Sequence, residues 1–179
     1  MPRLVPPTVS VHSSFLAAMA EFRAEGRGGQ DDATVIGHDH QTYGHTWHTE
    51  AGFAAYVADL LAQPREETPR PEGWVPATTR WLIEGDEYLG RIQIRHRLTD
   101  HLLREGGHIG YDVRTSARRH GHASRMLQEI LPLARSLGID PVLVTCESDN
   151  TASRRVIEKS KGALEDEQDG KLRFWVPAG

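Results

Sequence analysis

Apolar and polar positions along the chain follow two periods, and each change of period marks a predicted element. Residues 4–11 are rich in β-branched side chains but include two prolines, a combination that predicts an edge strand. A spacing of three to four then predicts a helix that Ser13 or Ser14 caps and that ends at Gly26. Its buried face would consist of Phe15, Leu16, Met19 and Phe22.

The following stretch is polar before helical spacing returns. Residues 27–43 begin with glycines and acidic residues and predict a long exposed loop. Residues 49–63 predict a second helix. The buried face of that helix would contain Phe53, Tyr56, Val57, Leu60 and Leu61. Prolines within residues 64–71 prevent its continuation and predict a surface connection.

In the central part of the chain, apolar and polar residues alternate with the two-residue period of strands. Residues 78–84 and 87–98 meet at Gly85 and Asp86, which predicts a hairpin whose apolar positions alternate with polar neighbours. An irregular or helical link then leads to a predicted strand over residues 108–114.

A strand–helix–strand unit comes next. Residues 121–137 predict a helix that Gly138 ends, and residues 141–146 predict a short buried strand. The helix would bury Met126, Leu127, Ile130, Leu131, Leu133 and Ala134. Strands joined in this way are expected to be parallel with a right-handed crossover. A last helix over 150–160 and a hairpin around Asp169 and Gly170 complete a mixed α/β order, which we predict to form one domain over residues 1–179.

The composition narrows the classes of function. Hydrophobic residues at 38% and charged residues at 26% are ordinary for a globular protein, and a formal net charge of -4 argues against general nucleic-acid binding. The single cysteine, Cys146, excludes an internal disulfide. The chain has no apolar run of roughly 20 residues and no signal-peptide pattern, so we expect a cytoplasmic protein with no membrane partner.

The segment between the strand at 108–114 and the helix at 121–137 predicts an anion site. The first N–H groups of a helix have no partner within the helix and carry positive partial charge. Arg118 and Arg119 precede Gly121, whose missing side chain lets an incoming group approach the backbone, and Ala123 keeps the next turn narrow. Such a loop is best suited to a phosphate or pyrophosphate.

Two motifs resemble one enzyme family. Arg118-Arg119-His120-Gly121-His122-Ala123 fits the pattern Gln/Arg-x-x-Gly-x-Gly/Ala and resembles the acetyl-CoA-binding signature of the GNAT superfamily of N-acetyltransferases. Residues 149–159 are similar to the Asn-x-x-(Ala/Ser) helix start of that family. The resemblance covers residues 75–176 well and is closest to a bacterial branch of predicted acetyltransferases, with residues 1–74 as a variable N-terminal part.

The resemblance implies a fold, a co-substrate and a site. The fold would be a GNAT-like mixed and mostly antiparallel sheet with a central parallel βαβ crossover, splayed strands and helices on both faces. Acetyl-CoA would lie between the splayed strands, with a backbone N–H near Val113 polarising the thioester carbonyl. The residues expected to bind it are Tyr111, Asp112, Val113, Arg114, Arg118, Arg119, His120, Gly121, His122, Ala123, Ser124, Asn150 and Ser153.

The catalytic groups are less defined, because the position of the tyrosine that many family members use is Ile157 here. The candidates for proton transfer are His108, Tyr111 and Glu147, with His96 as a further histidine nearby. For each of them a structural role is the alternative. Cys146 could form an acyl-cysteine, but a buried small residue is the stronger expectation.

A cluster of histidines and a cluster of acidic residues could each bind a ligand, but each also has a simpler structural interpretation. His38, His40, His45 and His48 could suggest a metal, but their spacing matches no familiar zinc pattern, and we expect a solvated loop and no metal. Residues 165–167 are acidic and could attract a cationic amine, although the polar face of a hairpin is the simpler interpretation.

These observations favour an acetyl-CoA-dependent N-acetyltransferase in which a primary amine of a small molecule or peptide attacks the thioester directly. A non-catalytic sensor of CoA or acyl-CoA is the alternative that Ile157 motivates. A nucleotide-phosphate-binding protein of another family is disfavoured by the absence of a Gly-Lys-Ser/Thr motif. The family also makes a homodimer plausible.

Overall fold

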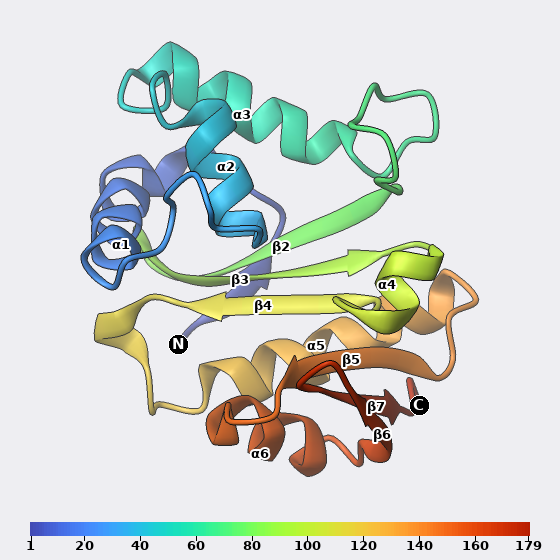
Figure 1. Ribbon diagram of the computed structural model, residues 1–179. Helices are drawn as coiled ribbons and strands as arrows, with labels where there is room; N and C mark the ends of the chain where they lie inside the picture. The colour runs from blue at the N-terminus through green and yellow to red at the C-terminus, as the bar shows by residue number, and fades with distance from the viewer.

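A seven-stranded sheet separates two layers of helices in the computed structural model, which describes residues 1–179 (Figure 1). The strand order is β1-β2-β3-β4-β5-β7-β6. All neighbouring strands are antiparallel except β4 and β5. The predicted mixed sheet with a central parallel crossover and helices on both faces is therefore confirmed.

The strands are β1 (Arg3–Val5), β2 (Ala77–Glu84), β3 (Glu87–Arg95), β4 (Ile109–Val113), β5 (Val142–Glu147), β6 (Ala163–Gln168) and β7 (Lys171–Val176). The helices are α1 (His12–Ala24), α2 (Val35–Tyr43), α3 (Glu50–Ala62), α4 (Asp100–Arg104), α5 (His122–Ser136) and α6 (Thr151–Lys159), with 3-10 turns at Val9–Val11 and Thr115–Ala117. No helix is both long enough and apolar enough to cross a membrane.

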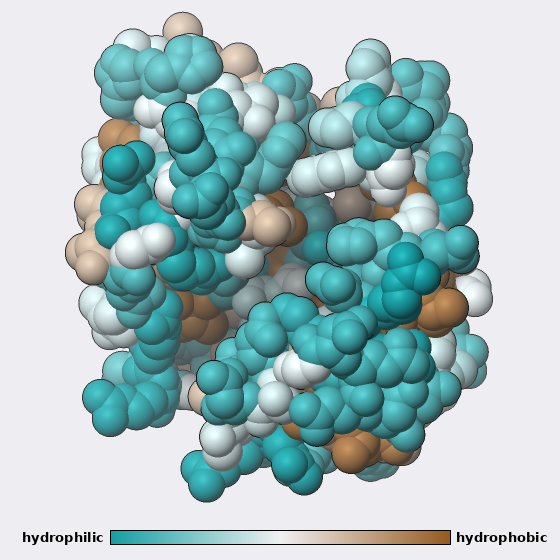
Figure 2. Space-filling view, viewed as in Figure 1, coloured by the Kyte–Doolittle hydropathy of each residue, from teal (hydrophilic) through white to brown (hydrophobic).

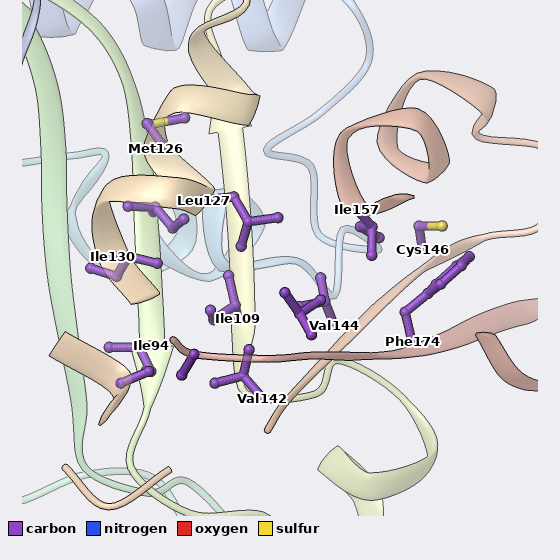
Figure 3. Packing of buried hydrophobic residues seen from close by; sticks show 14 of the residues in the cluster. Ile94, Ile109, Met126, Leu127, Ile130, Val142, Val144, Cys146, Ile157 and Phe174 are labelled. Atoms are coloured by element: carbon purple, nitrogen blue, oxygen red, sulfur yellow. The ribbon is translucent and has the colours of Figure 1, made fainter. Parts of the chain in front are cut away.

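Helices α5 and α6 cover one face of the sheet (Figure 1). Met126, Leu127 and Ile130 of α5 are buried, as their helical spacing predicts, and they point toward β3 and β4 (Figure 3). Leu131 and Leu133, predicted for the same face, are only partly buried. This layer packs against β4 and β5, the parallel pair of strands.

Helices α1, α2 and α3 cover the opposite face (Figure 1). Their contact with the sheet is an aromatic cluster in which the ring of Phe15 lies 5.5 Å from that of Trp81 and 5.4 Å from that of Tyr88. Aromatic rings bury much apolar area per residue, so a few of them can anchor three helices to two strands.

Strands β4 and β5 form a fork. Ile109 and Val144 are the only register pair between them. Below that pair, the N–H of His108 donates to the carbonyl of Leu143 over 2.7 Å, and the N–H of Leu143 donates to Nδ1 of the His108 ring over 2.9 Å. Beyond the pair the two strands diverge, which confirms the predicted splayed strands.

The structure corrects three details of the sequence analysis. Residues 35–43 form helix α2 instead of an exposed loop, with Thr34 accepting a hydrogen bond from Gly37 as its cap. Helix α1 begins without a serine cap, and the Ser14 hydroxyl accepts from the N–H of Tyr88 instead. Leu61, predicted to be buried on α3, is 47% exposed. The link at 99–107, predicted to be irregular or helical, includes the short helix α4, in agreement with that prediction.

Candidate active site

A cavity of about 730 Å³ opens on the face of the sheet that carries α1–α3. Helix α2, residues 69–75 and α4 surround it, strands β3 and β4 form its floor, and it reaches the fork at β5 and α6. Figure 2 shows the hollow near the middle of the visible face. The cavity therefore extends from the face of the sheet that carries α1–α3 to the opening between β4 and β5.

The free edge of β4 faces this opening. The N–H of Arg114 donates to the carbonyl of Leu89 on β3 over 3.0 Å. Peptide groups alternate in direction along a strand, so the N–H groups of Val113 and Tyr111 point to the opposite edge, toward the fork. No strand pairs with that edge beyond Ile109. An amide-containing chain could pair there in the manner of an added strand.

The loop before α5 presents a run of unpartnered backbone donors. The N–H groups of residues 119–124 donate to no acceptor in the protein, and Gly121 begins the helix without a side-chain cap. Arg119 and Gly121 have φ values of 66° and 79°, which fold the loop back on itself. A Cβ at Gly121 would meet nothing within 4 Å, so space for a ligand remains open beside the amides. These features fit the predicted pyrophosphate cradle.

Two arginines that were expected to bind acetyl-CoA are instead ion-paired with carboxylates in the last turns and at the C-cap of α1. Arg114 bonds Glu21 at 2.5 Å and Arg118 bonds Glu25 at 2.5 Å. Burial opposes ionisation of Glu21, but hydrogen bonds from Arg114 and Ser116 prevail and lower its pKa to about 2. These side chains hold the loop to α1, so the backbone donors, with Arg119, His120 and His122 beside them, are what the loop offers to an anion.

At the inner end of the fork lies a small polar group from β4 and α6. The Tyr111 hydroxyl lies 2.6 Å from Oγ of Ser153, and Oδ1 of Asn150 caps α6 by accepting from the N–H of Ser153 over 3.0 Å. All three residues line the cavity. Burial raises the pKa of Tyr111 to about 12 even though the bond to Ser153 opposes it, so the phenol keeps its proton at neutral pH.

Ile157 and Cys146 belong to the core around this group. Ile157 is fully buried on α6 and points toward the sheet near Cys146 (Figure 3). A group at position 157 would thus face the core. Cys146 is 7% exposed and lines the cavity, and burial raises the pKa of its thiol. A thiol with a raised pKa is a poor nucleophile near neutral pH.

The other predicted proton-transfer groups have different positions. Glu147 lines the cavity and is ion-paired with Lys171. His108 is 7% exposed and does not line the cavity, and burial followed by the charge of Arg95 lowers its pKa to about 4. His96 also lies outside the lining and bonds Thr78 at 2.9 Å. Of these three, the structure brings only Glu147 to the cavity.

The histidine cluster was predicted to lie in a solvated loop, but His38 and His40 lie on helix α2. Only His38 of the four clustered histidines lines the cavity, and no group of three or more His, Cys, Asp or Glu side chains is placed to hold a metal ion. In the last hairpin, Asp166 accepts hydrogen bonds from Arg173 and Glu165 accepts from the indole N–H of Trp175. The acidic run is therefore tied to its own hairpin.

Sequence reasoning missed the polar floor of the cavity. Arg91, Gln93 and Arg95 of β3 all line it, and Arg91 is paired with Asp39 of α2 over 2.5 Å. The Tyr56 hydroxyl donates to the same Asp39 oxygen over 2.7 Å. The only signal in the sequence was the two-residue alternation of polar positions in β3, which by itself is typical of a solvent-facing side.

A family model described as an acetyltransferase (GNAT) domain matches residues 30–162, which is more than half of the chain. No curated protein matches the sequence. The matched range includes the anion loop, the fork, and helix α2.

Solved structures with this fold include RimJ of Mycobacterium smegmatis in complex with CoA-disulfide, with a TM-score of 0.67 and 17% identity over 99% of this chain and 82% of that one. The microcin C7 self-immunity acetyltransferase MccE in complex with acetyl-CoA and AMP has a TM-score of 0.63 and 10% identity over 98% and 92% of the two chains. A ribosomal-protein-S5-alanine acetyltransferase from Vibrio fischeri has a TM-score of 0.63 and 12% identity over 98% and 90%. At these identities the likeness shows the fold.

Proposed function

Because the chain belongs to the GNAT family of acetyltransferases, we propose that it uses acetyl-CoA to acetylate a primary amine of a small molecule or peptide. The observation that carries the proposal is the run of unpartnered N–H groups over residues 119–124, placed beside a fork with a free strand edge. The structures of MccE and RimJ, which hold acetyl-CoA and CoA-disulfide, support the same co-substrate.

The residues fit coenzyme A along its length. The backbone donors of 119–124 suit the pyrophosphate, and the exposed Arg119 has no ion pair and is free to meet a further phosphate. The free edge at Tyr111 and Val113 suits the amides of the pantetheine arm. The amide nitrogen of Asn150, which bonds no protein acceptor, adds a donor at the far wall.

Bound acetyl-CoA supplies an activated acyl carbon, and transfer forms a C–N bond to the acceptor as the C–S bond breaks. The N–H of Val113 is directed at the fork, where it can stabilise negative charge on the carbonyl oxygen. Tyr111 holds its proton and can offer it to the departing sulfur. Glu147, at the cavity wall, can take the proton that the amine loses.

We propose direct attack by the amine, without an acyl-cysteine. The raised pKa of Cys146 and its packing in the core disfavour a thiolate there. A Cys146→Ala variant should keep its turnover within about twofold in a thiol-release assay. Loss of all turnover with intact folding would instead favour the two-step route.

The test of the function is calorimetric titration with acetyl-CoA, followed by thiol release over a panel of amines. Gly121→Glu puts a carboxylate beside the free N–H groups and should abolish binding. Gly138→Glu is the matched control, because Gly138 also has a positive φ and open space but lies at the other end of α5. No binding by the unaltered protein at millimolar ligand would contradict the proposal, and binding without any turnover would favour the sensor.

A further inference from the structure

The floor of the cavity is more basic than an amine acceptor requires. Alternation along β3 places Arg91, Gln93 and Arg95 on the cavity face, while Ile92 and Ile94 point into the core against α5. Arg91 and Gln93 are 3% and 8% exposed. Buried cations are retained only where a partner or a ligand compensates them.

Most charges in the cavity wall are already compensated. Arg91 is paired with Asp39, Arg27 with Asp112 at 2.7 Å, and Lys171 with Glu147. Arg95 has no carboxylate partner. The remaining lining carboxylate, Glu105, is exposed and forms no ion pair. One uncompensated cation is thus left on the floor.

Only one of the two terminal nitrogens of the Arg95 guanidinium donates hydrogen bonds to the protein. Its Nη1 donates to the carbonyls of Gly106 and Gly107 over 3.0 and 3.1 Å, whereas Nη2 bonds nothing. Gly110 of β4 lies opposite, and a Cβ there would be 3.8 Å from Nη2, so the missing side chain leaves this edge of the guanidinium open. Burial, and then the charge of Arg91, lower the pKa of Arg95 to about 10, as expected for a cation without a counter-ion.

We propose that Arg95 binds an anionic group, a carboxylate or a phosphate, carried by the amine acceptor. The planar guanidinium can donate two parallel hydrogen bonds to either group. Gln93, whose amide nitrogen already donates to Thr79 over 3.2 Å, lies between Arg91 and Arg95 on the same strand. The inference rests on the proposed function and specifies its substrate class: an amine with an acidic group within the reach of the cavity.

Arg95 also donates hydrogen bonds to the turn before β4, so replacing it could disturb the fold. The test therefore alters Gly110 instead. Gly110 has ordinary backbone angles and only van der Waals neighbours, so Gly110→Asp and Gly110→Asn should both fold. The two variants are matched in size, but the aspartate supplies a carboxylate to Arg95. Inorganic phosphate and acetate are titrated calorimetrically against each protein at constant ionic strength with chloride, with and without saturating CoA.

We expect at least one anion to bind the unaltered protein and Gly110→Asn, and to bind Gly110→Asp at least tenfold more weakly. The tighter of the two anions identifies the acidic group. Equal affinity for both variants, or no anion binding to the unaltered protein, would overturn the proposal. Because this readout needs no turnover, it separates failure of the anion site from failure of acetyl transfer, which the acetyl-CoA titration reports.

Turnover with matched acceptors adds a second readout. β-Alanine is compared with its amide, and phosphoethanolamine with ethanolamine, by thiol release from acetyl-CoA. The acidic member of the pair that matches the tighter anion should have the higher kcat/KM by at least tenfold, and Gly110→Asp should remove this preference while Gly110→Asn keeps it. A preference for the neutral members in both pairs would contradict the proposal.

Discussion

His108 occupies the point where β4 and β5 separate, and its ring takes the place of a backbone acceptor. Nδ1 accepts from the N–H of Leu143, so this nitrogen carries no proton in the folded protein. The ring lies outside the cavity lining and its pKa is lowered to about 4, so we propose that it positions the fork and is not a proton-transfer group. A histidine at the base of the fork can thus be structural even where its intrinsic pKa suits catalysis.

His108→Ala should lower the free energy of unfolding by about 1–3 kcal/mol at pH 7, because it leaves the Leu143 N–H buried without an acceptor. The pKa of His108 is lower in the folded protein than its ordinary value near 6.5. The free energy of unfolding of the unaltered protein therefore decreases as the pH falls from about 6.5 toward 4, and the variant lacks this pH-dependent decrease. Urea unfolding across this pH range measures both effects. His101→Ala, at an exposed position of α4, is the control, and equal losses would contradict the assignment.

Tyr111→Phe should lower kcat by about 100-fold or more and leave the affinity for acetyl-CoA nearly unchanged, because it removes only the O–H offered to the leaving sulfur. Tyr43→Phe is a matched control: Tyr43 also lines the cavity, and burial likewise raises its pKa to about 12. Steady-state thiol release compares the two. Similar losses in both variants would mean that Tyr111 does not act as the proton donor.

At the scale of elements, α1 holds the anion loop through its carboxylates. Glu21 receives hydrogen bonds from Arg114 and from both the N–H and the hydroxyl of Ser116. The loop is therefore shaped before any ligand arrives, which reduces the ordering that binding must impose.

Glu21→Gln should lower the free energy of unfolding by about 1–3 kcal/mol at pH 7 and weaken acetyl-CoA binding. The pKa of Glu21 is about 2 in the folded protein. The difference in free energy of unfolding between the unaltered protein and the variant is therefore fully present above the ordinary pKa near 4.5 and disappears as the pH falls toward 2. Denaturant unfolding between pH 7 and 2 measures it. Glu158→Gln, which breaks an exposed pair with Arg154, should change little at any pH.

A buried ion pair between Asp39 and Arg91 connects helix α2 to strand β3 at the cavity. Asp39→Asn should lower the free energy of unfolding by about 3–5 kcal/mol, because it leaves Arg91 buried without a counter-charge. Thermal and urea unfolding measure the loss against Asp59→Asn, an exposed change on the neighbouring α3. A loss no larger than that of the control would show that α2 is held by other contacts.

For the whole molecule, the fold could be predicted wherever apolar spacing is regular. The hairpin of β2 and β3, helix α5 and the hairpin of β6 and β7 have strong local patterns, and the structure confirms them. Helix α2 could not be predicted, because it has little apolar periodicity and one of its three buried residues is the charged Asp39. The partner that makes this burial favourable, Arg91, lies 52 positions away.

In the candidate site too, features with a local sequence pattern could be predicted, and features that depend on distant residues could not. The anion loop could be proposed because its motif is continuous in the sequence, and the structure places Asn150 and Tyr111 in the cavity lining. The partners of Arg114 and Arg118 were not found, because Glu21 and Glu25 each lie 93 positions earlier. Spacing along one strand cannot show which distant segment covers it, and this is also why the basic floor of the cavity was missed.

The 93 positions between α1 and the anion loop have a consequence for synthesis of the protein on the ribosome. At about 5–20 residues per second, α1 emerges roughly 5 to 20 seconds before the arginines that bind its carboxylates. Until β2 and β3 emerge, Phe15 has no strand to pack against, because its partners on the sheet are Trp81 and Tyr88. A nascent chain that stops before β2 therefore exposes an aromatic helix, the kind of surface that chaperones bind. The anion loop follows β4, so the ability to hold coenzyme A comes late in translation.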